Sequence, residues 1–417
     1  MSVGAVTALS APRSHWALFR TSWWLVVVCI GLVVSACGPT HKANSGGSNK
    51  ASSTVDSSYV SPNQPIQFVA AKVGWRLGGT QMSAPESASG NSPQPYAAPR
   101  LYGSLLTTSD GGASWTTVDN SAQGFWGIDF VGDSDGWVVG ASGLLATTDG
   151  GSTWTSLPES GPGIRVVDFT SANDGWALTA TGQLEDSTDG GGTWTELATP
   201  SSQIAAACSA SATSGWIVGQ SGSVWATSNA GQAWTSDYVP SFATSNTAIQ
   251  SAQLICSGPS AWVGYNLGPA GVNSESYLVV RTENGGSTWT SVAGNPAGSL
   301  GPAPSGAPSF GESLGPMALV NANTAMVLGV CQTCVGSASP VATLWTTTNG
   351  GATFTSQGDS SASTLFPVGI SLDNQNPVQG QWVMAVPAIP APGTDVVAIL
   401  AGTTLSGPLA AVFSGDS

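Results

Sequence analysis

Histidine is nearly absent from this chain of 417 residues. The only two copies, His15 and His41, lie near the N-terminus. Everything after residue 41 therefore lacks the groups needed for Ser-His-Asp and Cys-His nucleophile schemes and for histidine-based metal sites. Charged residues are also scarce, at 8% of the sequence. We expect no cofactor and no metal site, and the composition assigns no catalytic residue.

The N-terminal apolar run is too short for an ordinary transmembrane helix of about 20 residues. This run, Trp23–Val34, has 12 residues, follows Arg13 and Arg20, and ends in Val34-Ser-Ala-Cys37. A basic start, a short apolar core and small residues are typical of a secretory signal peptide. Because the last four residues resemble the bacterial lipobox, we expect residues 1–36 to be removed and Cys37 to be lipidated. A conventional signal peptide with an incidental Cys37 is the alternative.

Basic residues are few, with 9 Lys and Arg against 23 Asp and Glu. All the acidic residues and seven of the nine basic ones follow Cys37, so the mature chain carries a net charge of about −16. This argues against binding to nucleic acid or to an anionic lipid surface through charge. Residues 37–66 are rich in Ser, Gly, Asn and Pro, which predicts a flexible tether that anchors residues 67–417 to the extracytoplasmic face of the cell membrane.

One eight-residue motif recurs six times in residues 67–417. Its copies are Thr108–Trp115, Thr147–Trp154, Ser187–Trp194, Thr227–Trp234, Thr282–Trp289 and Thr347–Phe354. The third residue is Asp110, Asp149, Asp189, Asn229, Asn284 or Asn349, and the last is Trp115, Trp154, Trp194, Trp234, Trp289 or Phe354. Successive copies are 39, 40, 40, 55 and 65 residues apart, and such a period indicates a repeat architecture.

Each copy has the composition of a tight turn followed by a strand. Asp-Gly or Asn-Gly supplies the positive φ angles of the turn, and the Asp or Asn oxygen accepts backbone N–H groups two or three residues on. Asn keeps that oxygen, so the change from Asp to Asn in the last three copies preserves a structural role and not a charge-dependent one. We expect the terminal aromatic residue to be a buried wedge between neighbouring sheets.

A second repeat lies out of phase with the first. A small residue and Trp, as in Gly136-Trp137 and Gly215-Trp216, recur five times before a strand-like run, and Ala325-Met326 and Gln381-Trp382 are two looser copies, which makes seven. Each unit then consists of four short strands separated by turn residues, which is typical of a propeller blade. The fold class is therefore all-β, a single β-propeller of residues 67–417. We expect seven four-stranded blades, with six or eight as alternatives, and the motif turns between the third and fourth strands.

The motif resembles the Asp-box, or bacterial neuraminidase repeat, of sialidases, sortilin-type receptors, some xyloglucanases and the photosystem II assembly and stability factors. Its pairing with Gly-Trp-Val-Val-Gly is most similar to the last family, which implies a propeller that binds proteins. Sialidase activity would need three arginines around the substrate and an Arg-Ile-Pro segment, and the chain has no such segment. The photosystem factors imply a basic patch, yet Arg76, Arg100, Arg165 and Arg281 are dispersed over the sequence.

Four cysteines follow the signal and the lipobox, namely Cys208, Cys256, Cys331 and Cys334. An even number outside the cytoplasm indicates disulfides, and four cysteines allow three connectivities. Cys208 and Cys256 fall in the first strands of neighbouring blades, where a bridge is geometrically feasible. Cys331 and Cys334 are expected to form a local structural disulfide, with a redox-active pair as the alternative.

The function that we expect is a protein-binding or assembly scaffold without enzyme activity, and a monomer. The alternatives are a glycoside hydrolase using two carboxylates and a polysaccharide-binding lectin with Trp126 or Trp225 as a stacking platform. The partner is then a protein or a polysaccharide of the cell envelope. The carboxylates outside the boxes include Asp129, Asp133, Asp135, Asp168, Asp174, Glu185 and Asp186, and an enzyme requires two of them to converge. Binding residues are also expected in the insertions at residues 80–100, 266–277, 293–312 and 331–340.

Overall fold

The computed structural model describes residues 65–70, 72–78, 101–119, 124–158, 163–244, 249–271, 274–295, 313–331, 341–357, 365–372, 381–387, 397–402 and 410–415. These residues form 28 strands and one short 3₁₀ helix, Ser241–Thr244. No helix among them is long and apolar enough to cross a membrane. The all-β class is therefore confirmed.

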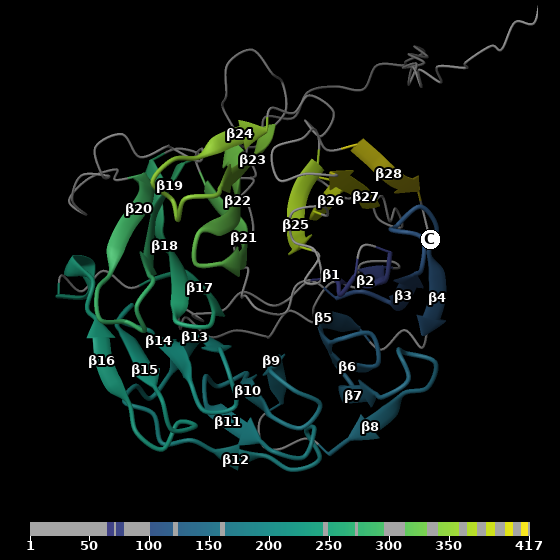
Figure 1. Ribbon diagram of the computed structural model, residues 1–417, viewed down its shortest axis with the longest axis horizontal. Coiled ribbons are helices and arrows are strands. Elements are labelled where there is room, and N and C mark those ends of the chain that lie inside the picture. The colour runs from purple at the N-terminus through teal and green to yellow at the C-terminus, as the bar shows by residue number, and fades with distance from the viewer. Residues whose placement is uncertain are drawn as a thin grey trace, which may run out of the picture. The chain divides into compact units, whose positions relative to one another are not determined.

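The described strands form seven antiparallel sheets of four strands each, and each sheet is built from consecutive strands. The sheets are arranged as blades around a central opening (Figure 1). Seven sheets match the expected number of blades. The last blade lies against the first, because β25 contacts β1. The ring therefore closes without any strand exchanged between the first and last blades.

The first three blades have short, regular strands. Their bounds are, for blade 1, β1 (Ile66–Phe68), β2 (Gly74–Gly78), β3 (Ser104–Thr108) and β4 (Thr116–Asp119); for blade 2, β5 (Phe125–Val131), β6 (Asp135–Gly140), β7 (Gly143–Thr147) and β8 (Thr155–Leu157); and for blade 3, β9 (Ile164–Phe169), β10 (Gly175–Thr179), β11 (Leu184–Ser187) and β12 (Thr195–Glu196).

The remaining blades include the longest strands of the ring. Their bounds are, for blade 4, β13 (Ile204–Ser209), β14 (Gly215–Gly219), β15 (Val224–Thr227) and β16 (Thr235–Tyr238); for blade 5, β17 (Ser251–Ser257), β18 (Ser260–Gly271), β19 (Ser274–Thr282) and β20 (Thr290–Asn295); for blade 6, β21 (Ser313–Asn321), β22 (Thr324–Cys331), β23 (Val341–Thr347) and β24 (Thr355–Gln357); and for blade 7, β25 (Leu365–Leu372), β26 (Gln381–Pro387), β27 (Val397–Gly402) and β28 (Ala410–Gly415).

Three expected boundaries need correction. The first strand begins at Ile66, one residue before the expected start of the domain. Much of the insertion expected at residues 266–277 is strand, because β18 and β19 continue their pairing as far as Gly271 and Ser274. The insertion expected at residues 293–312 begins inside β20, which runs to Asn295. Insertions in this ring thus lengthen strands as well as loops.

The second-strand tryptophans join neighbouring blades. Trp75 of blade 1 stacks on Phe130 of blade 2 with ring centroids 3.7 Å apart, and Trp137 of blade 2 stacks on Phe169 of blade 3 at 3.6 Å. Both tryptophans are buried, at 1% and 2% exposure. A side chain at Gly136 would lie 2.2 Å from the Phe130 ring. The glycine before Trp137 therefore leaves room for the aromatic ring of the adjacent strand.

The motif aromatics differ from the expectation. Each is half-buried and not fully buried. Trp154 meets Phe130 of its own blade edge-on at 6.1 Å, and its indole nitrogen donates to Gly151 O at 3.1 Å. The wedges between blades are thus the second-strand tryptophans. The motif aromatics cover the outer side of these stacks.

This difference in burial gives a prediction with a matched pair of variants. Trp137→Ala removes a ring that is buried, stacked on Phe169 and bonded to Gly190 O at 2.9 Å. Its free energy of unfolding should fall by about 3–5 kcal/mol. Trp154→Ala should cost less, because part of that side chain is already exposed to water. Urea unfolding of both variants measures the difference, and an equal or larger loss for Trp154→Ala would contradict this assignment.

Candidate functional site

The six motif turns, called boxes below, share one set of hydrogen bonds. In the second box, Thr147 Oγ1 donates to Asp149 Oδ1 at 2.8 Å and accepts from Gly151 N at 2.9 Å. Asp149 Oδ1 also accepts from Thr153 N at 2.8 Å. The carboxylate is thus bonded within its own turn, but to the N–H four residues on and not two or three residues on.

Asparagine makes the same contacts in the later boxes. Asn284 Oδ1 accepts from Thr288 N at 2.9 Å, and its amide nitrogen donates to Thr288 Oγ1 at 3.0 Å. In the acidic boxes the hydroxyl at that place donates instead, as Ser114 does to Asp110 at 2.6 Å. These hydroxyl and backbone bonds lower the pKa of Asp110 to about 2. The box carboxylates are therefore ionised structural acceptors, a role that Asn can replace.

Each box is also bonded to the turn between the first two strands of its blade. Gly150 N donates to Ser134 O at 2.9 Å and Gly190 N to Asn173 O at 2.9 Å, and the other four boxes repeat the bond. In the fourth box this residue is Ala230, which has a φ of 56° where the others have glycine. Both kinds of turn therefore lie on one face of the ring, which we call the box face.

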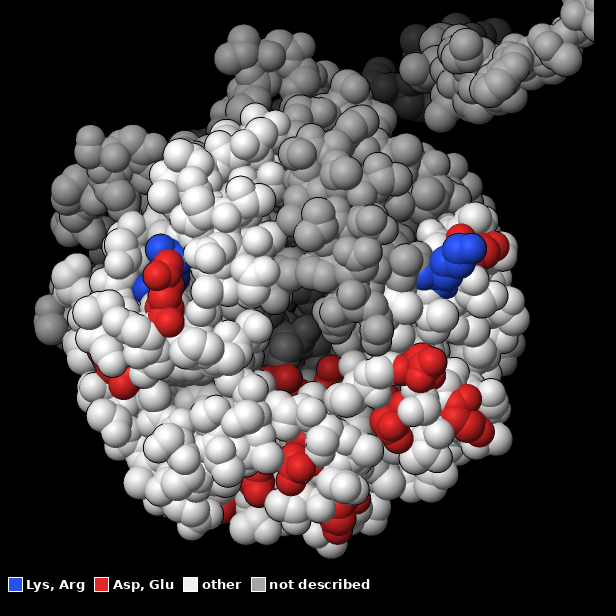
Figure 2. Space-filling view, in the orientation of Figure 1, with Lys and Arg blue, Asp and Glu red and all other residues white. Residues whose placement is uncertain are grey.

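Acidic side chains gather over blades 2 and 3 in Figure 2, and few basic ones are visible. Asp133 is exposed and Asp135 is half-buried, both in the turn of blade 2, and Asp174 is half-buried in that of blade 3. Asp174 Oδ2 accepts from Ser171 Oγ at 2.8 Å, within its own turn. These residues are turn residues of the repeat, and they make the face acidic.

Two further carboxylates accept hydrogen bonds from second-strand tryptophans. Asp237 Oδ2 accepts from Trp216 Nε1 at 3.2 Å, and Asp186 is bonded by Trp176. Burial raises the pKa of both carboxyls. Glu185, next to Asp186, is buried at 7% exposure. Asp186 and Asp237 are thus hydrogen-bonded to a tryptophan of their own blade, and Glu185 is buried within its blade.

A more informative position lies on the innermost strands, directly opposite the second-strand Trp. In the first blades this residue is Gln67, Asp129 or Asp168, paired with Trp75, Trp137 or Trp176. We call it the bridging position, because its side chain reaches the backbone of the next blade. The innermost strands are edge strands of their sheets, so their outward N–H groups have no strand partner.

The bridging side chains supply these missing partners. Gln67 Oε1 accepts from Phe130 N at 2.8 Å, and its amide nitrogen donates to Phe130 O at 3.0 Å. Asp129 Oδ2 accepts from Phe169 N at 2.7 Å. Asp168 Oδ2 accepts from Ser209 N at 2.6 Å. Three successive blade interfaces are therefore joined by the same kind of contact.

The fourth interface has a disulfide at this position. Cys208 stands opposite Trp216, and it is bonded to Cys256 of blade 5. Cys256 is the residue that pairs with Ala261, just before Trp262, so it occupies the place of Phe130 and Phe169. At the fifth interface Gln253 donates to Gly315 O at 2.9 Å and accepts from Met317 N at 3.2 Å.

Asp129 and Asp168 are neighbours in the ring, because Asp129 bonds the amide of Phe169, the residue that follows Asp168. Burial, and to a smaller extent the negative charge of Asp168, raises the pKa of Asp129 to about 8. Burial raises the pKa of Asp168 to about 6. Each side chain is partly reached by water, yet protein atoms surround both carboxyls densely enough for desolvation to dominate. In blades 1 and 4 the same position holds the amide of Gln67 and the disulfide of Cys208. Joining two blades at this position therefore does not require a carboxylic acid.

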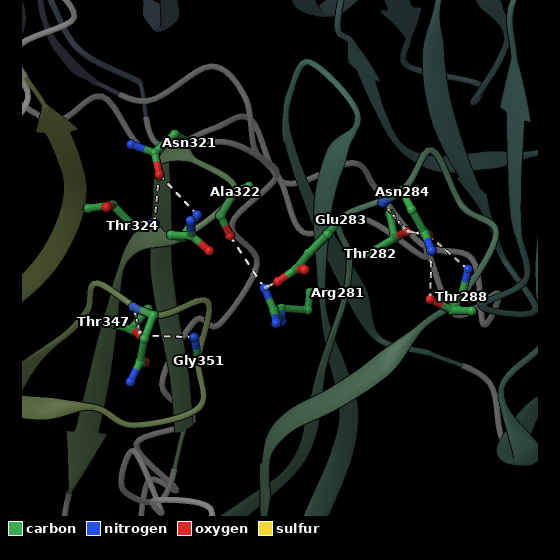
Figure 3. A network of polar contacts seen from close by, with 12 residues as sticks. Arg281, Thr282, Glu283, Asn284, Thr288, Asn321, Ala322, Thr324, Thr347 and Gly351 are labelled. Carbon is green, nitrogen blue, oxygen red and sulfur yellow. Dashed lines mark hydrogen bonds and ion pairs between the residues drawn. The ribbon is translucent and has the colours of Figure 1, made fainter.

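The arginines do not form an exposed patch in the described part of the chain. Arg76 and Arg165 are buried, at 0% and 8% exposure, and Arg100 lies outside the described residues. Arg281 lies between blades 5 and 6, where it pairs with Glu283 and donates to Ala322 O at 3.4 Å (Figure 3). The arginines thus contribute to packing and to blade contacts.

The two candidate stacking tryptophans are not free platforms. Trp126 is half-buried, and its indole nitrogen donates to Arg165 O of the next blade at 2.9 Å. Trp225 is half-buried against the cluster that contains Trp176 and Ile217. Among the described residues, no group of three or more His, Cys, Asp or Glu could hold a metal ion.

Several predicted features lie outside the described residues. These are the lipobox with Cys37, the tether, Cys334, and most of the insertions at residues 80–100, 293–312 and 331–340. Cys331 ends β22, and its side chain is not described. The bridging position was missed in the sequence, although its signal was present: Gln67, Asp129 and Asp168 each precede a phenylalanine, Phe68, Phe130 and Phe169 respectively.

Residues 159–304 match the family model described as "Photosynthesis system II assembly factor YCF48". This segment begins just before blade 3 and ends after blade 5, so it includes the disulfide and the third to fifth boxes. The chain is similar to the YCF48-type assembly factors. The resemblance inferred from the boxes and Gly-Trp repeats is therefore confirmed at the level of this family.

One solved structure, with a TM-score above 0.5, supports the same fold, and two others are similar at lower scores. A YCF48 bound to a D1 peptide is 15% identical, with a TM-score of 0.52 over 83% of this chain and 95% of that one. YCF48 from Cyanidioschyzon merolae is 16% identical, with a TM-score of 0.45 over 68% and 83%. The GH74 xyloglucanase from Xanthomonas campestris is 13% identical, with a TM-score of 0.48 over 68% and 44%. No curated protein sequence matches the chain.

Proposed function

We propose that the chain is a cell-envelope lipoprotein whose β-propeller binds a protein partner and acts as an assembly scaffold. The observation that carries this proposal is the match of residues 159–304 to a family of assembly factors. A relative with the same fold has been solved with a peptide bound. A rigid ring with long loops is suited to such binding, because loops on a stable scaffold can vary without disturbing the core.

The charges of the described surface restrict the partner. Arg76 and Arg165 are buried, so an arginine patch on these residues is not the basis of recognition. The box face is acidic over blades 2 and 3, which disfavours an anionic partner. We therefore do not expect the partner to present an acidic segment to exposed arginines of this propeller.

A carbohydrate-active module is the second candidate, because two acidic residues, Asp129 and Asp168, occupy neighbouring positions on the innermost strands. A glycosidase needs one carboxyl free to donate a proton and the other free to attack or to activate water. Here each carboxylate accepts a backbone N–H of the next blade. Release of reducing sugar from envelope polysaccharides, lost in Asp129→Asn and Asp168→Asn, would favour this candidate over the scaffold.

The membrane anchor is tested by lipid labelling. Metabolic labelling with a fatty-acid probe should mark the wild-type protein and leave Cys37→Ala unmarked, because the Cys37 thiol is the proposed acylation site. Cys29→Ala, in the apolar run before the lipobox, is the matched control and should be labelled normally. Equal labelling of Cys37→Ala and wild type would end the lipoprotein proposal.

The scaffold function is tested by capture of the partner. The propeller without its anchor, made as residues 54–417, should enrich a protein from the cell envelope of its own source. That protein, once purified, should form a complex of defined stoichiometry in size-exclusion chromatography with light scattering. The Trp137→Ala propeller, if destabilised as predicted, is the control for fold-dependent binding. Failure to enrich any protein, together with polysaccharide binding or hydrolysis, would contradict the proposal.

A further inference from the structure

Asp129 and Asp168 occupy the bridging position of adjacent blades and act at adjacent interfaces. Asp129 bonds blade 2 to Phe169 N of blade 3, and Asp168 bonds blade 3 to Ser209 N of blade 4. Their strands, β5 and β9, are in contact with each other. Blade 3 is therefore joined on both sides by carboxylates, where the interfaces before and after have an amide and a disulfide.

The surroundings of this pair contain no compensating cation among the described residues. Neither carboxylate has an ion pair with Lys or Arg. Arg165 lies on the opposite face of β9 from Asp168, since the two positions differ by an odd number. Arg76 follows Trp75, so it lies on the face of β2 turned away from blade 2. Asp135, at the start of β6, adds further negative charge.

The other strands that contact β5 and β9 add no titratable group. Residues Ile66–Phe68 of β1 and Gly175–Thr179 of β10 have none. The only thiol of β13, that of Cys208, is in the disulfide. Asp129 Oδ2 accepts from the amide of Phe169, the residue that follows Asp168, so the two carboxyls belong to neighbouring positions of the same junction. Two neighbouring carboxyls that are partly desolvated and lack a cation favour a state in which one of them is protonated.

We propose that Asp129 and Asp168 form a proton-holding pair that makes the interfaces of blade 3 more stable at acidic than at alkaline pH. A protonated Asp129 still accepts Phe169 N–H through its carbonyl oxygen, as the amide of Gln67 does for Phe130 N–H. Loss of the proton leaves both hydrogen bonds and adds repulsion between two negative charges across blade 3. The device thus changes the strength of the interfaces and not their geometry.

The direction of the pH effect follows from the pKa values. The pKa of Asp129 is raised to about 8 in the folded ring, chiefly by burial and then by the charge of Asp168, against about 3.9 in an unfolded chain. The folded state therefore holds more protons than the unfolded state between these values. The contribution of this proton to the free energy of unfolding is fully present below about pH 4 and is lost as the pH rises to about 8.

The experiment compares melting temperatures of the full propeller at pH 5 and pH 9 at constant ionic strength. The wild-type Tm should fall by more than about 4 °C between them. Asp129→Asn keeps the hydrogen-bond acceptor and removes the charge. In this variant the fall in Tm between pH 5 and pH 9 should be at most half of the wild-type fall. Asp186 and Asp237 also have pKa values raised by burial, so the difference between variant and wild type is the quantity that counts.

The matched control is Asp149→Asn, in the second box. It removes one carboxylate from the same blade, and the last three boxes already have Asn there. Because the pKa of Asp149 is lowered by its hydroxyl and backbone bonds, this group is ionised at both pH values and the fall in Tm should be unchanged. An equal fall in wild type and Asp129→Asn would overturn the proposal.

A second measurement does not depend on the variant folding. Infrared spectroscopy of the wild-type propeller in D2O at pH 7 should show the carbonyl band of a protonated carboxyl group, which disappears by pH 9. The unfolded chain at pH 7 should lack the band, because its carboxyls are ionised. Absence of the band from the folded protein would also overturn the proposal.

Discussion

The ring depends on how the free edges of its innermost strands are satisfied. Each blade has an inner strand with no neighbour on one side, and unpaired backbone groups there would be costly to bury. A side chain from the preceding blade supplies the acceptor at three interfaces, and the next interface has a disulfide at the same register. The adjacent Trp–Phe stacks fill the space beside two of these contacts. Polar satisfaction and apolar packing therefore meet at the first two junctions between blades, whereas the boxes are bonded within their own blades.

Much of the fold could be predicted because it is local. Thr147, Asp149 and Thr153 lie within seven residues of one another, so their turn chemistry is visible in the sequence. The burial of Trp137 against Phe169 and the bridge from Asp129 to Phe169 N could not be predicted with the same certainty, because they join residues of different blades. The half-burial of Trp154 was missed for a related reason, since the sequence does not show which of two tryptophans per blade faces the neighbouring blade. The Asp129–Asp168 pair likewise arises only when the ring brings β5 beside β9.

The described carboxylates and arginines have structural roles, so they do not identify the function of the protein. The box carboxylates, the bridging carboxylates and the buried arginines are all used to hold the ring together. Beyond these structural groups, the described part of the chain has an acidic surface over blades 2 and 3, a disulfide between blades 4 and 5, and long strands in blades 5 and 6. A scaffold whose acidic groups are engaged in turns and blade contacts can vary its rim, and it is on the rim that a partner would be distinguished.

The central claim is that bridging side chains satisfy the open edges of the inner strands. Amide hydrogen exchange at Phe130, Phe169 and Ser209, followed by NMR, tests it most directly. These amides lie on strand edges without a neighbouring strand, yet the account predicts that they are protected to the level of ladder amides in the same blades. Replacement of Asp129 by Ala should release the Phe169 amide and leave that of Phe130, which Gln67 holds, protected. Exchange at all three positions as fast as in an exposed strand edge would contradict the account.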